Sequence, residues 1–564
     1  METKEIRFAP QAPDRERRRS APRGRRTDPA ALDEVRSLLG DMPRRRDLLI
    51  EYLHRIQDHD GHLSVRHLAA LAAELGMAQA EVFEVASFYH HFDVVREGEA
   101  PPPALTVRVC ESLSCEMAGA RDLLARLPAI LGAGVRVVGT SCIGRCNEAP
   151  AVLAGQRPLA HATVDIVAGA VAAGDTAHVH AGHLGYDAYR AQGGYALLRD
   201  CIDGRRSADE VIAQLEHSGL RGLGGAGFPA GRKWRIVREQ PGPRHLAVNI
   251  DEGEPGTFKD RIYLESDPHR FLEGMLIAAW AVGIDAIWIY LRDEYHGCRA
   301  MLEAELALLR ADPPVAALPR IELRRGAGAY ICGEESAMVE SIEGKRGMPR
   351  LRPPYLAQVG LFGRPTLEHN FETLFWVREI VEKGGDWFAA HGRNGRRGLR
   401  SFSVSGRVKL PGMKLAPAGI TVRELIDEYC GGMQDGHVFH AYLPGGASGG
   451  ILPASMGDIP LDFDTLQPHG CFIGSAAVIV LSQQDSVKDA ARNLMHFFSH
   501  ESCGQCTPCR AGTAKAAELI AQPRWDTALL GELSAVMRDA SICGLGQAAP
   551  NPVDCVIRYF PDEP

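Results

Sequence analysis

The sequence predicts an α/β protein of several domains, and three observations lead to that prediction. First, the chain has 564 residues, whereas a single domain usually has about 100 to 200. Second, strand-like and helix-like segments alternate in two regions, 104–180 and 205–400, as they do in α/β units. Third, eight of the 14 cysteines fall into two tight groups, one near each end of the chain. Clustered cysteines in a reducing compartment indicate metal or redox chemistry more often than disulfides.

Composition and charge exclude several classes of protein. The formal net charge is -8, which argues against nucleic acid as the main partner. No apolar run reaches the roughly 18 residues that a membrane helix needs, so we expect no membrane segment. The first residues lack the apolar core of a signal peptide, and we expect a cytoplasmic protein. Residues 1–28, with seven arginines between Arg15 and Arg26, are expected to form a disordered, solvated arm.

The first folded part, residues 29–95, is predicted to be a small helical bundle. Apolar residues between Leu48 and Ile56 recur at helical spacing. Ser64 and Gly76 are expected to begin and end a second helix, because serine caps helix N-termini and glycine ends helices. A third helix, rich in apolar and aromatic residues, is expected over 80–92.

The remaining elements follow from periodicity and from turn residues. Within 104–180 the sequence predicts strands at 105–109, 135–138 and 151–153 and a helix at 118–131. Residues 181–204 are expected to be a linker. Region 205–400 should hold strands at 246–250 and 286–291 and an apolar helix at 271–282. Region 401–485 should be rich in β-structure, and 486–564 should be helical.

The C-terminal cysteine group has the spacing of an iron–sulfur site. Cys503, Cys506 and Cys509 lie within seven residues, and Cys543 follows at a distance. Three closely spaced thiolates and a remote fourth suit one [4Fe–4S] cluster. Structural zinc is the alternative, but zinc commonly uses two separated pairs of ligands. No further cysteine follows three residues after Cys509, so we expect one cluster here and not two.

The N-terminal group consists of two pairs, each after a strand-like segment. Cys110 and Cys115 form the first pair, and Cys142 and Cys146 form the second. Each pair has the spacing to hold one iron of a [2Fe–2S] cluster from two adjacent loops, with zinc as the alternative. Gly144 would let the second loop approach the sulfides closely. The other six cysteines are isolated and are expected to be buried structural residues.

A glycine-rich loop lies between the two cysteine groups. It reads Gly222-Leu-Gly224-Gly225-Ala226-Gly227-Phe228, which fits G-x-G-x-x-G. The segment before it, Ser207 to His217, is predicted to be a helix, so the strand of a dinucleotide-binding fingerprint is missing. Such a loop still lets backbone amides approach phosphate or a flat ring, and Lys233 could pair with a phosphate. A purely structural turn is the alternative.

Two stretches of acids and glycines follow the loop. Asn249 to Gly256 comes directly after a strand, and Gly326 to Ser336 is the second stretch. Carboxylates at strand ends suit the hydroxyls of ribose, and they repel a 2′-phosphate, which would favour NAD over NADP. Plain solvation is the alternative for either stretch.

Taken together these motifs resemble those of the 51-kDa NADH-oxidising subunit of respiratory complex I. The resemblance rests on the runs 222–228, 251–260, 326–336 and 501–510 and covers residues from about 200 to the end. Residues 29–180 resemble the 24-kDa subunit of complex I. The resemblance implies a thioredoxin-like [2Fe–2S] domain at 104–180, a Rossmann-like FMN and NADH domain at 205–400, a β-grasp-like domain at 401–485 and a helical [4Fe–4S] domain at 486–564.

The resemblance also implies roles for individual residues. NAD would meet Gly225, Ala226, Phe228, Glu254 and Glu335, with Glu335 at the ribose and Glu254 beside the reacting rings. The two cysteine groups would ligate the [4Fe–4S] and [2Fe–2S] clusters. His369-Asn370 departs from the two asparagines usual in the family. The residues implied to hold FMN are Gly222, Gly224, Lys233, Asn249, Asp251, Glu252, Tyr330, Gly333, Glu334 and Asn370.

Fusion of the two modules in one chain resembles the diaphorase subunits of soluble NAD-linked enzymes. All four N-terminal cluster cysteines are present, whereas many hydrogenase versions have lost theirs. This favours a formate dehydrogenase, whose alpha subunit would carry molybdenum or tungsten and further clusters. The alternatives are an NAD-reducing hydrogenase, a fused NADH-input subunit of complex I and, in another class, an electron-transfer scaffold without catalysis.

Overall fold

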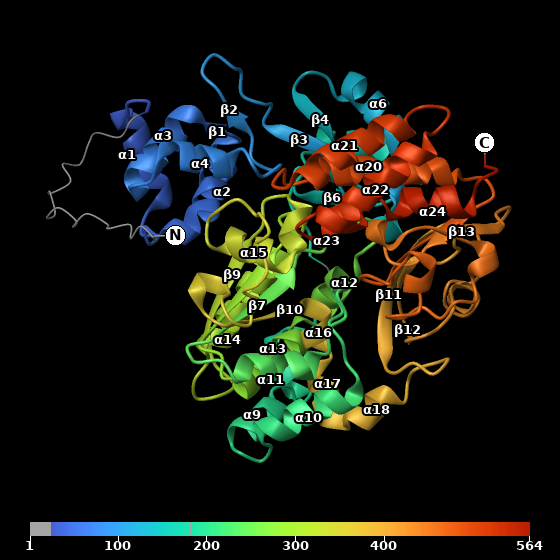
Figure 1. The fold of residues 1–564 in the computed structure, drawn as a ribbon. Helices are drawn as coiled ribbons and strands as arrows, with labels where there is room; N and C mark the ends of the chain where they lie inside the picture. The colour runs from blue at the N-terminus through green and yellow to red at the C-terminus, as the bar shows by residue number, and fades with distance from the viewer. Residues whose placement is uncertain (1–23, 181, 564) are drawn as a thin grey trace, which may run out of the picture.

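A computed structural model describes residues 24–180 and 182–563 of the chain, and Figure 1 shows its ribbon. The arginine-rich arm predicted for residues 1–28 lies outside the described residues up to residue 23. Four sheets and the helices around them make up this part of the chain. The α/β multidomain prediction is confirmed. No helix within the described ranges combines the length and apolarity needed to cross a bilayer.

The N-terminal bundle packs directly on the central part of the chain. Its helices are α1 (Pro29–Leu39), α2 (Leu49–Asp60), α3 (Val65–Leu75) and α4 (Gln79–Ala86). Ser64 and Gly76 cap α3 as predicted. The serine hydroxyl accepts a hydrogen bond from the amide of His67, and the backbone of the glycine has the left-handed conformation. In Figure 1 the bundle lies beside α15 (Glu335–Ile342), and Tyr89 Oη donates to Ser341 Oγ of that helix at 2.9 Å.

The third helix is shorter than the sequence predicts. The pattern extends it to Phe92, but α4 ends at Ala86, where the Ser87 hydroxyl donates to the carbonyl of Phe83. Beyond it the amides of His90 and His91 donate to Gly328 and Ala327 of the central domain. Pairing with another domain therefore replaces the next helical turn and places two histidines at the domain boundary.

The second region has the predicted thioredoxin-like arrangement. Its sheet has the order β4-β3-β5-β6, in which β3 and β4 are parallel and the other pairs antiparallel. The strand-end loops that carry the cysteines thus meet at one edge. The elements are β3 (Leu105–Cys110), α5 (Leu113–Met117), α6 (Ala120–Leu131), β4 (Val135–Thr140), β5 (Val152–Ala154), β6 (Arg157–Leu159) and α7 (Val164–Ala172).

The linker predicted at 181–204 is instead largely helical. Helices α8 (Tyr186–Ala191) and α9 (Ala196–Ile202) occupy it. Tyr186, Tyr189 and Tyr195 are buried there, and Tyr195 Oη lies 2.8 Å from Nδ1 of His269. The segment has the composition of a linker, so the burial of these tyrosines was not predicted. Their side chains attach the segment to the central domain.

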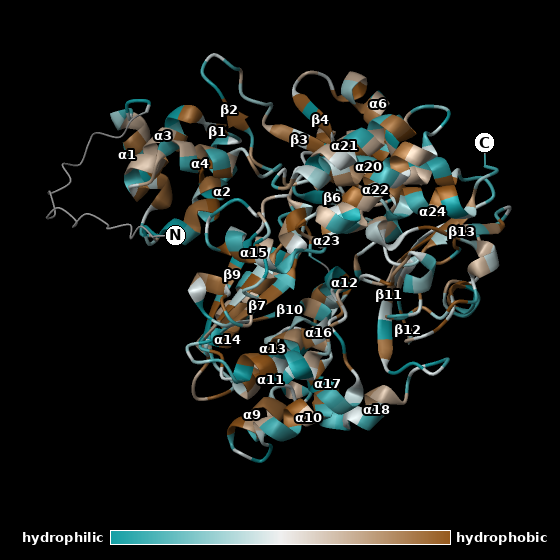
Figure 2. Cartoon of the chain, viewed as in Figure 1, coloured by the Kyte–Doolittle hydropathy of each residue, from teal (hydrophilic) through white to brown (hydrophobic). Residues whose placement is uncertain are grey.

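The central domain is a four-stranded parallel sheet of order β10-β7-β8-β9. Figure 2 shows the strands around β7 largely in brown, which matches a parallel sheet that is covered on both faces. The ends of β7 and β10 lie side by side, with Asn249 opposite Asn370. The main elements are α10 (Ala208–Ser218), α11 (Ala230–Arg238), β7 (His245–Ile250), α12 (Lys259–Ser266), α13 (Pro268–Val282), β8 (Ala286–Leu291), α14 (His296–Ala311), β9 (Arg320–Arg325), β10 (Thr366–Asn370), α16 (Phe371–Phe375), α17 (Val377–Lys383) and α18 (Gly385–Ala389).

A mixed five-stranded sheet and a helical domain complete the chain. The sheet has the order β12-β11-β15-β13-β14, with only β11 and β15 parallel, as expected for a β-grasp-like domain. Its strands are β11 (Leu399–Gly406), β12 (Gly412–Pro417), β13 (Phe439–Leu443), β14 (Leu452–Pro453) and β15 (Ala477–Ser482). The helices that follow, shown in red in Figure 1, are α20 (Val487–Glu501), α21 (Thr507–Ile520), α22 (Thr527–Ala540), α23 (Gly544–Ala548) and α24 (Asn551–Tyr559).

Candidate redox site

The four N-terminal cysteines form one buried thiol cluster. Cys110 ends β3, Cys115 lies in α5, and Cys142 and Cys146 lie in the loop after β4, with their two sulfurs 3.4 Å apart. Hydrogen bonds with Cys110 and Cys146 lower the pKa of Cys142 well below its usual range. Hydrogen bonds with Cys115 and then with Cys142 raise the pKa of Cys110, and the bond with Cys142 raises that of Cys146. Arg292 lies close by and further favours the thiolate. Such a set fits a [2Fe–2S] cluster, whose ligands are thiolates.

Gly144 explains how the second cysteine loop fits against the central domain. It has a φ of +71°, and a Cβ atom there would lie 2.2 Å from the Tyr295 hydroxyl. The carbonyl of Gly144 accepts from Nε of Arg261 at 3.0 Å. The loop that holds two of the four thiols is therefore attached to the central domain.

The four C-terminal cysteines also converge. Cys506 and Cys543 sit at the N-termini of α21 and α23, and Cys509 lies in the first turn of α21. Together with Cys503 they line one small pocket closed by Ile331 and Pro349. Burial raises the pKa of Cys509 to about 11 and that of Cys543 to about 12. Burial disfavours the thiolate form, whereas bound iron would favour it. The four cysteines therefore fit an iron–sulfur cluster.

The glycine-rich loop joins α10 to α11 and is held at both ends. The amide of Gly222 donates to the carbonyl of Phe228 at 2.8 Å, and the amide of Leu223 donates to Thr373 Oγ1 at 2.9 Å. A Cβ atom at Gly224 would lie 2.9 Å from Cβ of Asn370, and Gly225 has a φ of +126°. The loop follows a helix and not a strand, as predicted. Gly224, Ala226 and Phe228 are exposed, so backbone and an aromatic face are open to a ligand.

Charged side chains gather around Lys233 on α11. Its Nζ lies 2.8 Å from a carboxylate oxygen of Glu368 and 3.8 Å from one of Glu335. Burial disfavours the ammonium ion, but the two carboxylates outweigh it and raise the pKa of Lys233. Glu335 also pairs with Arg352 at 3.0 Å. The structure thus brings together the predicted Lys233 and Glu335, and it adds Glu368 and Arg352, which sequence reasoning missed.

Glu254 is held from two sides in the loop after β7. Its Oε1 accepts from the amide of Ser448 at 2.8 Å and from that residue's hydroxyl, and its Oε2 accepts from Tyr330 Oη at 3.3 Å. Burial raises the pKa of Glu254, and these hydrogen bonds oppose the rise. Ser448 was missed by sequence reasoning, although the glycine-rich run from Gly445 to Gly450 signals a close backbone approach.

Several predicted FMN residues already have partners within the chain. Asn249 Nδ2 donates to the carbonyl of Gly333 at 2.9 Å, and Asn370 Nδ2 donates to Asp260 Oδ2 at 2.6 Å. Glu334 caps α15. Backbone and side-chain atoms at the ends of β7 and β10 therefore lie beside the glycine-rich loop. Their contacts with FMN stay a prediction.

Two further carboxylates that are predicted to contact FMN, those of Glu252 and Asp251, lie in the loop after β7. Both Glu252 oxygens accept bonds from the protein, among them the amides of Asp260 and Arg261, and burial raises the pKa of Glu252 to about 7. Asp251 lines a cavity on the side of the [2Fe–2S] loop, together with Arg292. The direct contacts of these two acids with FMN also stay predictions.

His369, where the chain departs from the asparagine pair, belongs to the core. Its Nε2 accepts from Nε1 of Trp234 at 2.8 Å, and the residue is buried. Burial and the positive charge of Lys233 lower its pKa well below the usual range, which keeps the ring neutral. The departure thus replaces an amide by an imidazole that packs against α11.

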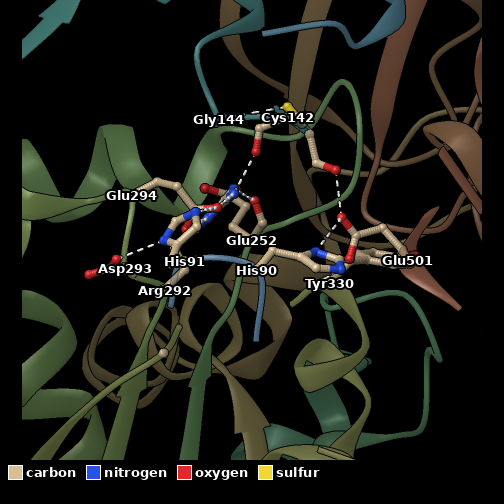
Figure 3. A network of polar contacts seen from close by, with 12 residues as sticks. His90, His91, Cys142, Gly144, Glu252, Arg292, Asp293, Glu294, Tyr330 and Glu501 are labelled. Atoms are coloured by element: carbon tan, nitrogen blue, oxygen red, sulfur yellow. Dashed lines mark hydrogen bonds and ion pairs between the residues drawn. The ribbon is translucent and has the colours of Figure 1, made fainter. Parts of the chain in front are cut away.

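The two cysteine groups and the central domain meet around Glu501. This carboxylate accepts from Ser141 Oγ at 2.5 Å and from the amide of Tyr330 at 3.0 Å (Figure 3). Ser141 precedes Cys142, and Glu501 lies two residues before Cys503. Arg292 adds a second link, because its guanidinium donates to the carbonyl oxygens of Cys142 and Glu252. Polar contacts from Glu501 and Arg292 therefore link the loop of Cys142, the segment before Cys503 and the central domain.

Comparison with known proteins identifies the family. The chain is 40% identical over 393 residues to the second F-type subunit of the NADH-quinone oxidoreductase of Rhizobium meliloti, across 67% of this chain and 93% of that protein. The chain belongs to the NADH dehydrogenase 51-kDa flavoprotein family. This flavoprotein is also 41% identical to the mitochondrial NADH-ubiquinone oxidoreductase 51 kDa subunit of Neurospora crassa, over 63% of the chain and 76% of that subunit.

Family models and a solved structure assign the parts of this flavoprotein. The models that match are the Nuo51 FMN-binding domain at 215–379, the NADH-ubiquinone oxidoreductase-F iron-sulfur binding region at 489–564 and the thioredoxin-like [2Fe-2S] ferredoxin at 35–173. A crystal structure of an NAD+-reducing [NiFe]-hydrogenase in the H2-reduced state matches with a TM-score of 0.81 and 32% identity, over 92% of this chain and 93% of that chain. The expected FMN, [4Fe–4S] and [2Fe–2S] centres are confirmed, and NAD fits as the substrate.

Proposed function

We propose that this chain is the NAD-linked diaphorase subunit of a soluble, cytoplasmic formate dehydrogenase. Electrons would pass reversibly between NAD+ and an alpha subunit that carries molybdenum or tungsten and further iron–sulfur clusters. The observation that carries the proposal is the buried cluster of Cys110, Cys115, Cys142 and Cys146 in a chain fused to the flavoprotein. A diaphorase that had lost its N-terminal cluster would not keep four converging thiols.

The activity of the flavoprotein depends on what its residues do around FMN. FMN supplies the exchange between a two-electron hydride donor and one-electron iron–sulfur acceptors. Exposed Phe228 offers an aromatic face to a nucleotide, and Glu335 offers a carboxylate to a ribose hydroxyl. The negative charge of Glu254 favours the positive ring of NAD+ over neutral NADH, because opposite charges attract. Tyr330 and Ser448 keep that carboxylate in place.

The placement of the proposed nicotinamide site and the [4Fe–4S] site supports a continuous route for electrons between them. Tyr330 contacts Glu254 through its hydroxyl, and its ring packs on Phe497 of α20 with ring centroids 4.9 Å apart. The neighbouring Ile331 lines the pocket of the four C-terminal cysteines. The segment 330–331 thus lies between the proposed nicotinamide site and the [4Fe–4S] site.

A hydrogenase diaphorase is the second candidate. It is supported by the similarity of the NAD+-reducing [NiFe]-hydrogenase structure over 92% of this chain, which includes the N-terminal module. A fused NADH-input subunit of complex I is the third, supported by the curated relatives.

Metal analysis of the complex that co-purifies with the natively expressed chain tests the proposal. Molybdenum or tungsten without nickel, together with formate-dependent reduction of NAD+, is the expected result. Nickel would instead indicate a hydrogenase diaphorase. Iron alone, with membrane subunits, would indicate complex I. A different class of function, a scaffold without catalysis, predicts that the chain loaded with FMN oxidises no NADH with ferricyanide as acceptor.

A further inference from the structure

Two histidines and a buried glutamate meet where three domains join. His90 comes from the segment after α4, and His500 and Glu501 end α20. One ligand atom from each of the three side chains lies within 4.8 Å of the other two. These residues belong to neither cysteine group and to none of the predicted contacts with FMN or NAD.

Hydrogen bonds within the protein hold the carboxylate of this cluster in place without a bound ion. Glu501 is 5% exposed. Its Oε2 is held by the amide of Tyr330, and its Oε1 accepts from Ser141 Oγ and lies 3.3 Å from Nδ1 of His500 (Figure 3). A preorganised carboxylate loses little entropy when it binds a further ligand.

The segment that carries His90 is anchored as well. The next residue, His91, places its Nδ1 2.7 Å from Asp293 Oδ2, and the amides of both histidines donate to the loop Ala327–Gly328. The ring of His90 makes no hydrogen bond within the described part of the chain. Its Nδ1 lies 4.0 Å from Glu501 Oε1, and its centroid lies 4.2 Å from that of the His500 ring. The side chain is 41% exposed and can therefore turn.

We propose that His90, His500 and Glu501 bind one divalent transition-metal ion of the zinc class and so clamp the N-terminal bundle to the C-terminal helical domain. Two imidazoles and one carboxylate are ligands that zinc accepts, whereas magnesium and calcium require oxygen ligands. Bonds of about 2.0–2.1 Å in a tetrahedron place neighbouring ligand atoms about 3.3 Å apart. The spacing between His500 and Glu501 already has this value, and a rotation of the His90 side chain would shorten the two remaining distances, from His90 to each of the other ligands.

The fourth coordination position faces a polar cavity. The three residues line this cavity of about 280 Å³, whose wall also contains Asp251, Glu294 and the arginines Arg108, Arg136 and Arg292. Arg136 and Arg292 are neutralised by Asp93 at 2.6 Å and by Glu294 at 2.7 Å. The cavity wall is polar, so water is the expected fourth ligand. The ion would lie beside the cluster loops without replacing a cysteine.

Zinc K-edge absorption spectroscopy tests the proposal on the holoprotein, with both clusters loaded and one equivalent of Zn2+ added after treatment with chelator. We expect one zinc per chain, bound to nitrogen and oxygen at about 2.0–2.1 Å, with a multiple-scattering pattern of imidazole. A sulfur shell at about 2.3 Å would overturn the proposal, because it would place zinc on cysteines. Mg2+ should not compete.

A matched pair of variants gives a second readout. The affinity of H90A for zinc should be at least tenfold lower. The variant should also lose the rise in melting temperature that zinc gives the unaltered holoprotein. H217A is the control, because His217 is also an exposed histidine and pairs with Asp386 at 2.8 Å, outside the cluster. Should H90A fold poorly, H90Q keeps a polar side chain and replaces it. Unchanged zinc affinity in the folded variant, or equal loss in H217A, would reject the site.

Discussion

Tyr330 donates its hydroxyl hydrogen to Oε2 of Glu254 at 3.3 Å, while its backbone amide donates to Oε2 of Glu501 at 3.0 Å. One residue thus joins the proposed nicotinamide site to the chain segment that leads into Cys503. The hydroxyl also stabilises the ionised form of Glu254, whose pKa is raised by burial and lowered in part by this bond.

Tyr330→Phe should therefore raise the pKa of Glu254 further. If ionised Glu254 assists hydride transfer, activity falls as pH drops through that pKa, and the acid limb of the NADH–ferricyanide profile should move to higher pH. Activity on the alkaline plateau should fall no more than about tenfold, since one hydrogen bond is lost. Tyr290→Phe is the control, because the Tyr290 hydroxyl contacts Ser341 at 3.0 Å and not Glu254. An unmoved acid limb would remove Glu254 from the reaction.

Glu335→Ala should relax the preference for NADH over NADPH. The carboxylate repels a 2′-phosphate, whereas its partners Arg352 and Lys233 would attract one once Glu335 is removed. The ratio of kcat/KM for the two nucleotides should fall by about ten- to 100-fold, the scale of one lost charge interaction. Glu343→Ala, just beyond the end of α15, controls for general damage. A preference as strong as that of the unaltered protein would take Glu335 out of the ribose site.

The two cluster sites should be separable by cysteine substitution. With both clusters the chain should hold about six irons, four in one centre and two in the other. Cys543→Ala should leave about two irons and a [2Fe–2S] signal, and Cys110→Ala should leave about four. Cys430→Ala is the control, because Cys430 is buried and belongs to neither group. Iron counting with electron paramagnetic resonance gives the answer. Loss of both signals from either variant would mean that the two sites do not assemble independently.

His54 makes the docking of the N-terminal bundle sensitive to acid. Its Nε2 lies 2.8 Å from the carbonyl oxygen of Gly326, and burial lowers its pKa to about 3 from an ordinary value of 6.5. Between these values the unfolded chain binds a proton that the folded chain does not, so stability is lost as pH falls below 6.5.

His54→Gln keeps a donor near Gly326 but does not titrate. The unfolding free energy of the unaltered protein should therefore fall, relative to this variant, by about 1.4 kcal/mol per pH unit between about pH 6.5 and 5. Denaturant unfolding of the two proteins at several pH values measures the difference. Parallel curves would show that His54 binds a proton as readily in the folded as in the unfolded protein, which would contradict its burial as a neutral ring.

Sequence reasoning reached most of the strands and both cysteine groups because they carry strong local signals. Ser64 and Gly76 mark their helix, and the cysteine spacings mark the clusters. Sequence reasoning failed where contacts between residues far apart in the chain determine the local structure. Helix α4 ends early because the segment after it pairs with the loop Ala327–Gly328. In the same way Ser448 reaches Glu254 from 194 positions away, a relationship that no local pattern contains.

Lys259 forms a fully buried ion pair close to Asn370, which is predicted to contact FMN. Its Nζ lies 2.7 Å from Asp260 Oδ1 and 2.9 Å from Glu372 Oε2, and Asp260 in turn holds Asn370. Burial disfavours the ammonium ion, but the acids outweigh it and raise the pKa of Lys259. Removal of the ammonium leaves two acids without a counter-charge in the core, which costs about 3–5 kcal/mol.

Lys259→Met should therefore destabilise the protein by about 3–5 kcal/mol at about pH 8. The loss should shrink as pH falls, because the orphaned acids then take up protons and their repulsion disappears. FMN content should fall with stability, since Asn370 loses its fixed partner. Lys345→Met, at a half-exposed lysine that pairs with Glu343 at 2.7 Å, is the control and should cost less than about 1 kcal/mol. Equal losses in the two variants, or a loss in Lys259→Met that does not depend on pH, would contradict the buried-charge explanation.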